Sequence, residues 1–172
     1  PQMSAVDIEK YIKKKLKRND QVLRINEKNI GDQGLAVLSQ LPFISSVKTL
    51  TLYKVQIGDE GVSALTKSPY LKNLEVLFLE HNSITDKGVE IMARSSTFSE
   101  LKTLNLYHNQ ITDRGAQAIA RSDTLSRLEE VNLNYNQIKG PGAISLTRSK
   151  KLKKLHDIQL SYNPIAESGK KA

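Results

Sequence analysis

Two pairs of side chains in this sequence have types and spacings that could carry chemistry. His81 and His108 are 27 residues apart, and two imidazoles on adjacent turns of a repeating structure could share a metal ion. Glu130 and Asp157 are also 27 residues apart and could act as paired carboxylates in acid–base catalysis. A third metal ligand is not evident, and we expect both carboxylates on an open surface with no pocket to desolvate them. The sequence therefore predicts no metal, no other cofactor and no catalytic site, so that the chain is not expected to be an enzyme.

Other common catalytic and targeting signals are missing from the sequence. It contains no Gly-rich phosphate loop, no nucleophile elbow and no H-E-x-x-H helix. With 0 cysteines, disulfides, thiolate zinc sites and a cysteine nucleophile are excluded. No apolar run is long enough for a membrane span, and the first residues do not resemble a signal peptide. These features predict a cytoplasmic protein.

The 27-residue interval runs through the whole chain. The segments LEVLFLEHNSITDKG, LKTLNLYHNQITDRG and LEEVNLNYNQIKGPG align without a gap in the frame L-x-x-L-x-L-x-x-N-x-I-x-D-x-G. Four asparagines and six glycines keep this interval: Asn82, Asn109, Asn136 and Asn163, and Gly34, Gly61, Gly88, Gly115, Gly142 and Gly169. A fixed period of this length is the signature of a solenoid, in which stacked units share one apolar core that none could form alone.

Each unit predicts one short strand followed by one helix. Leu104 and Leu106 alternate with polar residues, which is the period of a strand with one buried face. The amide of Asn109 can bond a backbone N–H and a C=O of a neighbouring turn, so that stacked copies would form a ladder. Asp113 is predicted as the N-cap of the following helix. A basic residue at each helix end, such as Arg121, suits the helix dipole; the alternative is a basic ridge on the outside.

These elements predict an α/β solenoid, a right-handed arc with a parallel sheet on the concave face and helices on the convex face. Residues 1–19 are predicted as an N-terminal capping helix, whose Ile8, Ile12 and Leu16 would cover the first unit. Residues 20–172 are predicted as the repeat domain, with six repeats of which the last is incomplete. That uncapped end is expected to continue into a longer protein or to meet a partner, and an oligomer could form through it.

The repeat frame resembles the ribonuclease-inhibitor-like class of leucine-rich repeats. The segment ALTKSPYLKNLEVLFLEHNSITDKGVEIMA is most similar to bacterial tandem repeats built on S-P-x-L-x-x-L and N-x-I-x-D-x-G. The resemblance covers residues 20–169 and implies a sheet surface or adjoining loops that hold another protein. Unlike the cysteine-rich vertebrate inhibitors with alternating unit lengths, this chain has one uniform step and 0 cysteines.

The predicted partner-binding site lies on the concave face, where side chains alternate with the buried leucines. We predict that Tyr53, Phe78 and Tyr107 share one column across neighbouring strands, because central aromatics with a polar surround are typical of interface hot spots. The alternative is that aromatic residues simply suit strands. The complete predicted site is Tyr53, Val76, Phe78, Asn105, Tyr107, Asn132 and Asn134.

The net charge of +8 is concentrated at the two ends of the sequence. Residues 1–18 carry six basic and two acidic residues and residues 148–172 carry seven and two, whereas the 13 basic residues between them are balanced by 14 acidic ones. A nucleic-acid groove would concentrate charge along one face. We therefore predict a protein partner and expect neither nucleic acid nor a membrane; binding of an anionic partner, nucleic acid or a membrane surface, through the basic ends is the alternative.

Overall fold

The computed structural model describes residues 1–166, which fold into alternating strands and helices. The helices are α1 (Ala5–Leu16), α2 (Gly31–Ser39), α3 (Asp59–Thr66), α4 (Asp86–Ala93), α5 (Asp113–Ala120) and α6 (Gly140–Thr147), with short 3-10 helices at Pro42–Ile44 and Ser96–Phe98. The strands are β1 (Val22–Asn26), β2 (Thr49–Tyr53), β3 (Val76–Phe78), β4 (Thr103–Asn105), β5 (Glu130–Asn132) and β6 (Asp157–Gln159). None of the described helices is long and apolar enough to cross a membrane.

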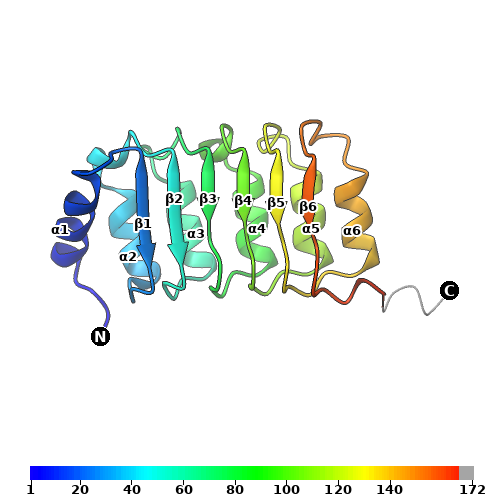
Figure 1. Cartoon of the computed structure of the whole chain (residues 1–172), viewed down its shortest axis with the longest axis horizontal. Helices are drawn as coiled ribbons and strands as arrows, with labels where there is room; N and C mark the ends of the chain where they lie inside the picture. Colours follow the sequence, from blue (N-terminus) through cyan, green and yellow to red (C-terminus); the bar gives the residue numbers. More distant parts are fainter. Residues whose placement is uncertain (167–172) are drawn as a thin grey trace.

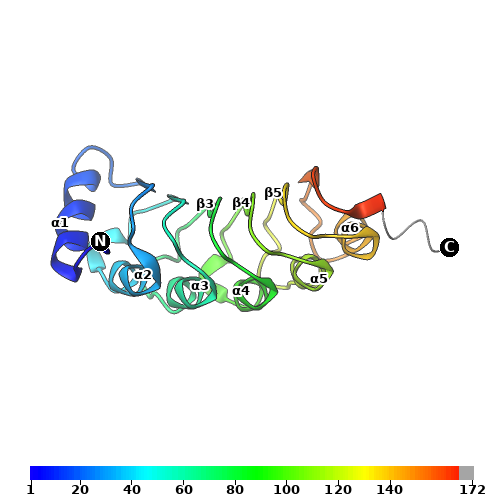
Figure 2. The same cartoon turned by 90° about the horizontal axis from the view of Figure 1, so that it is seen from below.

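The strands form one parallel sheet in sequence order from β1 to β6, as Figure 1 shows. Leu77 of β3 pairs with Leu104 of β4, which pairs with Val131 of β5, so equivalent positions of successive repeats lie side by side. Figure 2 shows the helices in a second layer along the outer curve, with the sheet on the inner side. The predicted α/β solenoid is confirmed.

The core lies between the sheet and the helix layer and runs the length of the array. Its side chains come from the repeat positions that the sequence pattern assigns to the interior, such as Leu50, Leu77 and Leu104, all fully buried. Helix α1 closes the first end, because its Ile8 and Ile12 are buried in the same cluster. The Ser4 Oγ accepts a hydrogen bond from the Asp7 N–H and so caps this helix. Gly169, the last residue of the predicted glycine series, lies outside the described residues.

The predicted asparagine ladder is confirmed. The buried Asn109 Oδ1 accepts a hydrogen bond from the Ile84 N–H of the preceding repeat at 3.1 Å. Its Nδ2 donates to the carbonyls of Leu79 at 3.0 Å and Leu106 at 3.1 Å. Asn136 makes the equivalent bonds one repeat further along. Each amide thus joins two turns that are distant in sequence and satisfies backbone groups that the bend leaves unpaired.

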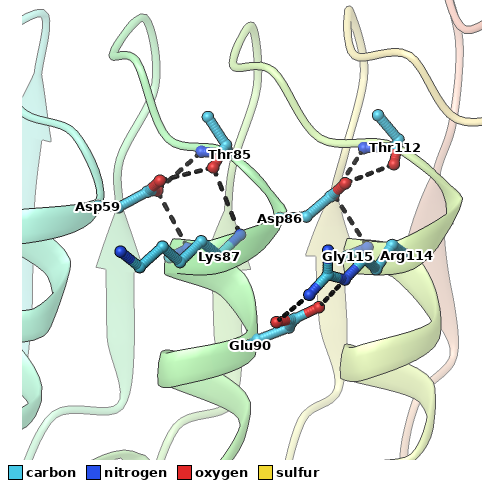
Figure 3. Close-up of polar contacts among 9 residues, drawn as sticks. Asp59, Thr85, Asp86, Lys87, Glu90, Thr112, Arg114 and Gly115 are labelled. Carbon is cyan, nitrogen blue, oxygen red and sulfur yellow. Dashed lines mark hydrogen bonds and ion pairs between the residues drawn. The ribbon is translucent and has the colours of Figure 1, made fainter.

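The predicted N-cap role of the repeated aspartates is wrong. Asp86 is the first residue of α4, whose N-cap is Thr85. Its Oδ1 accepts instead from the next repeat, from the Thr112 N–H at 2.8 Å and the Gly115 N–H at 2.9 Å, and its Oδ2 accepts from the Thr112 hydroxyl (Figure 3). The carboxylate therefore caps the helix of the neighbouring unit, because that helix begins beside it in the stack.

This inter-repeat cap explains four glycines of the series, Gly61, Gly88, Gly115 and Gly142, whereas Gly34 lies against Ile8 and Ile30. A Cβ on Gly115 would lie 2.6 Å from the Asp86 Oδ1, and a Cβ on Gly61 would lie 2.6 Å from the Asp32 Oδ1. Glycine normally weakens a helix interior by roughly 1 kcal/mol. Here it leaves room for the carboxylate that binds the first turn of the next helix.

Candidate binding surface

One position in every repeat holds a large or charged residue in the left-handed backbone conformation. It lies where the chain leaves the strand, and its φ values range from 51° to 60°. The residues are Glu27, Lys54, His81, His108, Tyr135 and Tyr162. Residues other than glycine are uncommon in this region, and the conformation costs roughly 1–2 kcal/mol for a residue with a Cβ. The structure thus places bulky side chains at a turn where glycine or asparagine would be easier to accommodate.

The rings at this turn join tyrosines at the strand ends in one continuous row. We define the aromatic ridge as Tyr53, His81, Tyr107, His108, Tyr135 and Tyr162. The His81 and His108 rings are stacked with centroids 4.5 Å apart, and those of Tyr135 and Tyr162 are stacked at 4.1 Å. Tyr107 links the two halves, with its centroid 5.3 Å from His81 and 5.2 Å from Tyr135.

The ridge is open to solvent at its C-terminal end. Tyr135 is 39% exposed and Tyr162 is 71% exposed, and both are among the large hydrophobic residues that stay exposed in the described chain. Four of the 6 tyrosines and two of the 3 histidines in the sequence lie in the ridge. The exposed ring surface is therefore concentrated along one edge of the sheet.

Burial and charge perturb the pKa of ionisable groups at the ridge, among them Glu80 and His81. Partial burial raises the pKa of Glu80, which lies between Tyr53 and Tyr107 in the strand register. The Glu80 Oε1 is buried and has no hydrogen-bond partner among the described residues. Burial, followed by the nearby charges of His108 and Lys54, lowers the pKa of His81. Neutral His81 is therefore favoured near neutral pH.

The predicted single column of Tyr53, Phe78 and Tyr107 is wrong. Phe78 pairs with Thr51 and Asn105 on its two neighbouring strands. Tyr53 lies two residues beyond Thr51 along β2 and belongs to the column of Tyr107. Since one strand residue advances the chain by about 3.3 Å, Phe78 is displaced by roughly 7 Å from the tyrosine column.

The other predicted site residues lie on the same inner face, and the three asparagines among them accept backbone hydrogen bonds. The Oδ1 atoms of Asn105 and Asn132 accept hydrogen bonds from backbone N–H groups two residues further on, each at 2.9 Å. The Oδ1 of Asn134 accepts from the Ser161 N–H at 2.8 Å. Val76 is half-buried and pairs with Thr103. The structure therefore gathers all seven residues on one face, in more than one column.

A shallow depression of about 180 Å³ lies on this inner face. Its lining includes Phe78 from β3, Asn105 from β4 and Glu130 from β5. A larger groove of about 910 Å³ lies between α2 and α3, where its lining residues are small or polar and none is aromatic. Aromatic side chains, the usual anchors of an interface, are thus found on the sheet side rather than in the larger groove.

The sequence-based prediction did not include four residues of the ridge, namely His81, His108, Tyr135 and Tyr162. The signal for them was present, because they recur at the 27-residue interval directly after the strand alternation. Their position looks like an ordinary polar turn in the sequence. Only the φ values and ring distances show that they form one surface.

Three segments of the chain, residues 70–93, 100–120 and 126–146, match the family model described as Leucine Rich repeat. The repeats in these segments are leucine-rich repeats. Among solved structures it is similar to internalin C2 of Listeria monocytogenes, with a TM-score of 0.52 and 20% identity over 95% of this chain and 76% of that chain. A second internalin of that organism, inlF, has a TM-score of 0.44 and 20% identity over 83% of this chain and 48% of its own. A search of curated proteins found no match. At this identity the internalin C2 likeness concerns the fold.

Proposed function

We propose that this leucine-rich-repeat protein is a non-enzymatic recognition module that binds another protein across the aromatic ridge and the adjoining inner face of the sheet. Curved repeat proteins in general use such extended inner surfaces for binding. The continuous row of rings is the observation that carries the proposal, because it places tyrosine and histidine side chains side by side, with those of His108, Tyr135 and Tyr162 exposed.

Folding by itself gives little reason for these side chains. The core is complete without them, since its buried residues come from other repeat positions. Large residues at the left-handed turn also oppose folding slightly. Tyrosine, by contrast, supplies a large contact area with few rotatable bonds, which suits a binding surface.

Affinity capture with matched variants tests this proposal. Tyr135→Ser together with Tyr162→Ser removes the exposed end of the ridge, and Ile144→Ser removes a comparably exposed apolar side chain (51%) from helix α6. We expect the Ile144→Ser variant to retain the captured protein and the double variant to bind it at least about 30-fold more weakly, as for a hot spot of about 2 kcal/mol. Equal capture by all three proteins would refute the ridge as the binding surface.

A second candidate function is binding of an anionic partner, nucleic acid or a membrane surface, at the N-terminal cap. The Lys15 and Lys28 ammonium groups lie 5.4 Å and 5.7 Å from the centroid of the Tyr11 ring, so that both cations contact one aromatic side chain. Lys14 and Arg18 line the same surface. If this function operates, heparin or DNA binding will fall steeply with salt and will be lost in a Lys14→Ser, Lys15→Ser, Arg18→Ser variant; binding that is insensitive to salt contradicts it.

A further inference from the structure

The depression on the inner face combines an aromatic wall with a carboxylate. Phe78 of β3 and Glu130 of β5 both line it, and Asn105, Asn132 and Gln159 complete the polar part of the wall. Its volume of about 180 Å³ is below the roughly 300 Å³ at which small-molecule sites begin. The space suits one long side chain that enters from a bound protein.

Its acidic charge is not neutralised within the described part of the chain. Glu130 and Asp157 are direct neighbours on β5 and β6, and neither takes part in an ion pair among residues 1–166. Two basic residues come directly before the strand residues beside Glu130: Lys102 precedes Thr103 of β4, and His156 precedes Asp157 of β6. Both lie beside other carboxylates. Lys102 pairs with Glu75 at 3.2 Å, and the Nε2 of His156 lies 4.0 Å from Glu129.

We propose that this depression accepts an arginine side chain of the protein partner, an inference that rests on the proposed function. A guanidinium group can pair with a carboxylate through two parallel hydrogen bonds and can also stack on an aromatic face. Glu130 and Phe78 supply these two features in one depression.

Arginine fits this lining better than lysine. The Oδ1 atoms of Asn105 and Asn132 each accept one backbone hydrogen bond, and a carbonyl oxygen has a second lone pair for a further donor. The five N–H donors of a planar guanidinium can reach several such acceptors together, whereas lysine presents a compact and strongly hydrated charge.

A peptide titration followed by NMR tests the proposal without the natural partner. The probes are the capped tripeptides Gly-Arg-Gly, Gly-Lys-Gly and Gly-citrulline-Gly, for which roughly millimolar dissociation constants are expected from their size. We expect saturable shifts at Thr103, Asn105 and Asn132 with the arginine peptide, at least about fivefold weaker binding of the lysine peptide, and no saturation with citrulline, which lacks the charge.

Two variants separate this pocket from general electrostatic attraction. Glu130→Gln should abolish the arginine-dependent shifts, whereas Glu100→Gln, which alters a carboxylate paired with Arg127 elsewhere on the surface, should leave them unchanged. Equal binding of arginine and lysine peptides, or shifts that persist in Glu130→Gln, would overturn the proposal. If the capture assay still depends on Tyr135 and Tyr162 in that case, the proposed function stands and only the arginine pocket is wrong.

Discussion

The inter-repeat aspartate cap makes a quantitative prediction about stability. Asp86→Ala removes the acceptor for the Thr112 N–H at 2.8 Å and the Gly115 N–H at 2.9 Å, as well as for the Thr112 hydroxyl. The two N–H groups belong to the start of helix α5 and have no alternative intrahelical acceptor. A net hydrogen bond to a charged group contributes roughly 1.5 kcal/mol or more. Since the Thr112 hydroxyl can donate to water instead, we count only the two N–H groups and expect the free energy of unfolding to fall by about 3 kcal/mol.

Urea denaturation followed by circular dichroism measures this loss. Asp86→Asn keeps one carbonyl oxygen for both N–H groups and should cost only about 1 kcal/mol, because only the charge and the acceptor of the Thr112 hydroxyl are lost. The control is Asp123→Ala, whose carboxylate pairs with Lys151 at 2.6 Å and is 79% exposed; it should cost less than about 1 kcal/mol. A loss in Asp86→Ala as small as that of the control would refute the assignment of a cap across the repeat boundary.

The glycine opposite this carboxylate provides an independent check. Gly115→Ala would place a Cβ 2.6 Å from the Asp86 Oδ1 and 2.6 Å from the Ile111 Cγ2, an overpacking expected to cost roughly 1–3 kcal/mol. In the Asp86→Ala background one of these contacts is absent. The double variant should therefore lose about 1 kcal/mol less free energy of unfolding than the two single variants lose together. Losses that add within about 0.5 kcal/mol would contradict the proposed contact.

Three further predictions concern the ladder and the ridge. Asn109→Ala should destabilise the protein by about 3 kcal/mol in urea denaturation, because the Ile84 N–H and two buried carbonyls lose their partner; a loss below about 1 kcal/mol would contradict the ladder. Glu80→Gln should raise the melting temperature at pH 7, because the folded-state pKa lies above the ordinary 4.5 and the ionised carboxylate therefore opposes folding as pH rises. That gain should vanish well below pH 4.5, where the carboxyl is protonated in both states, and a gain that persists there would point to another cause. His108→Asn should leave stability equal or raise it by up to about 1 kcal/mol, since asparagine tolerates the φ of 54° better; a clear loss in the same assay would show that the ring is needed for folding.

The sequence alone determined the architecture of this protein. A constant interval of 27 residues places equivalent positions in equivalent environments. The strand and helix predicted for one repeat, from Leu104 to Ile119, can therefore be assigned to every other repeat. The alternation around Leu104 and Leu106 assigns one face to the core because side chains of a strand point to opposite faces in turn. The asparagine ladder followed for the same reason, as each amide meets the turn of the adjacent copy.

The tertiary structure alone decided where several polar and aromatic groups find their partners. Asp86 precedes a helix in sequence, so a local capping rule assigns it to that helix, yet the N–H groups it binds lie 26 and 29 residues further on, across the stack. The aromatic ridge also depends on contacts between repeats. Rings such as those of His81 and His108 stack only when successive turns adopt the left-handed conformation and lie side by side. Periodicity fixes which residues are equivalent, but the direction of a side chain depends on backbone angles that the pattern of residue types does not encode.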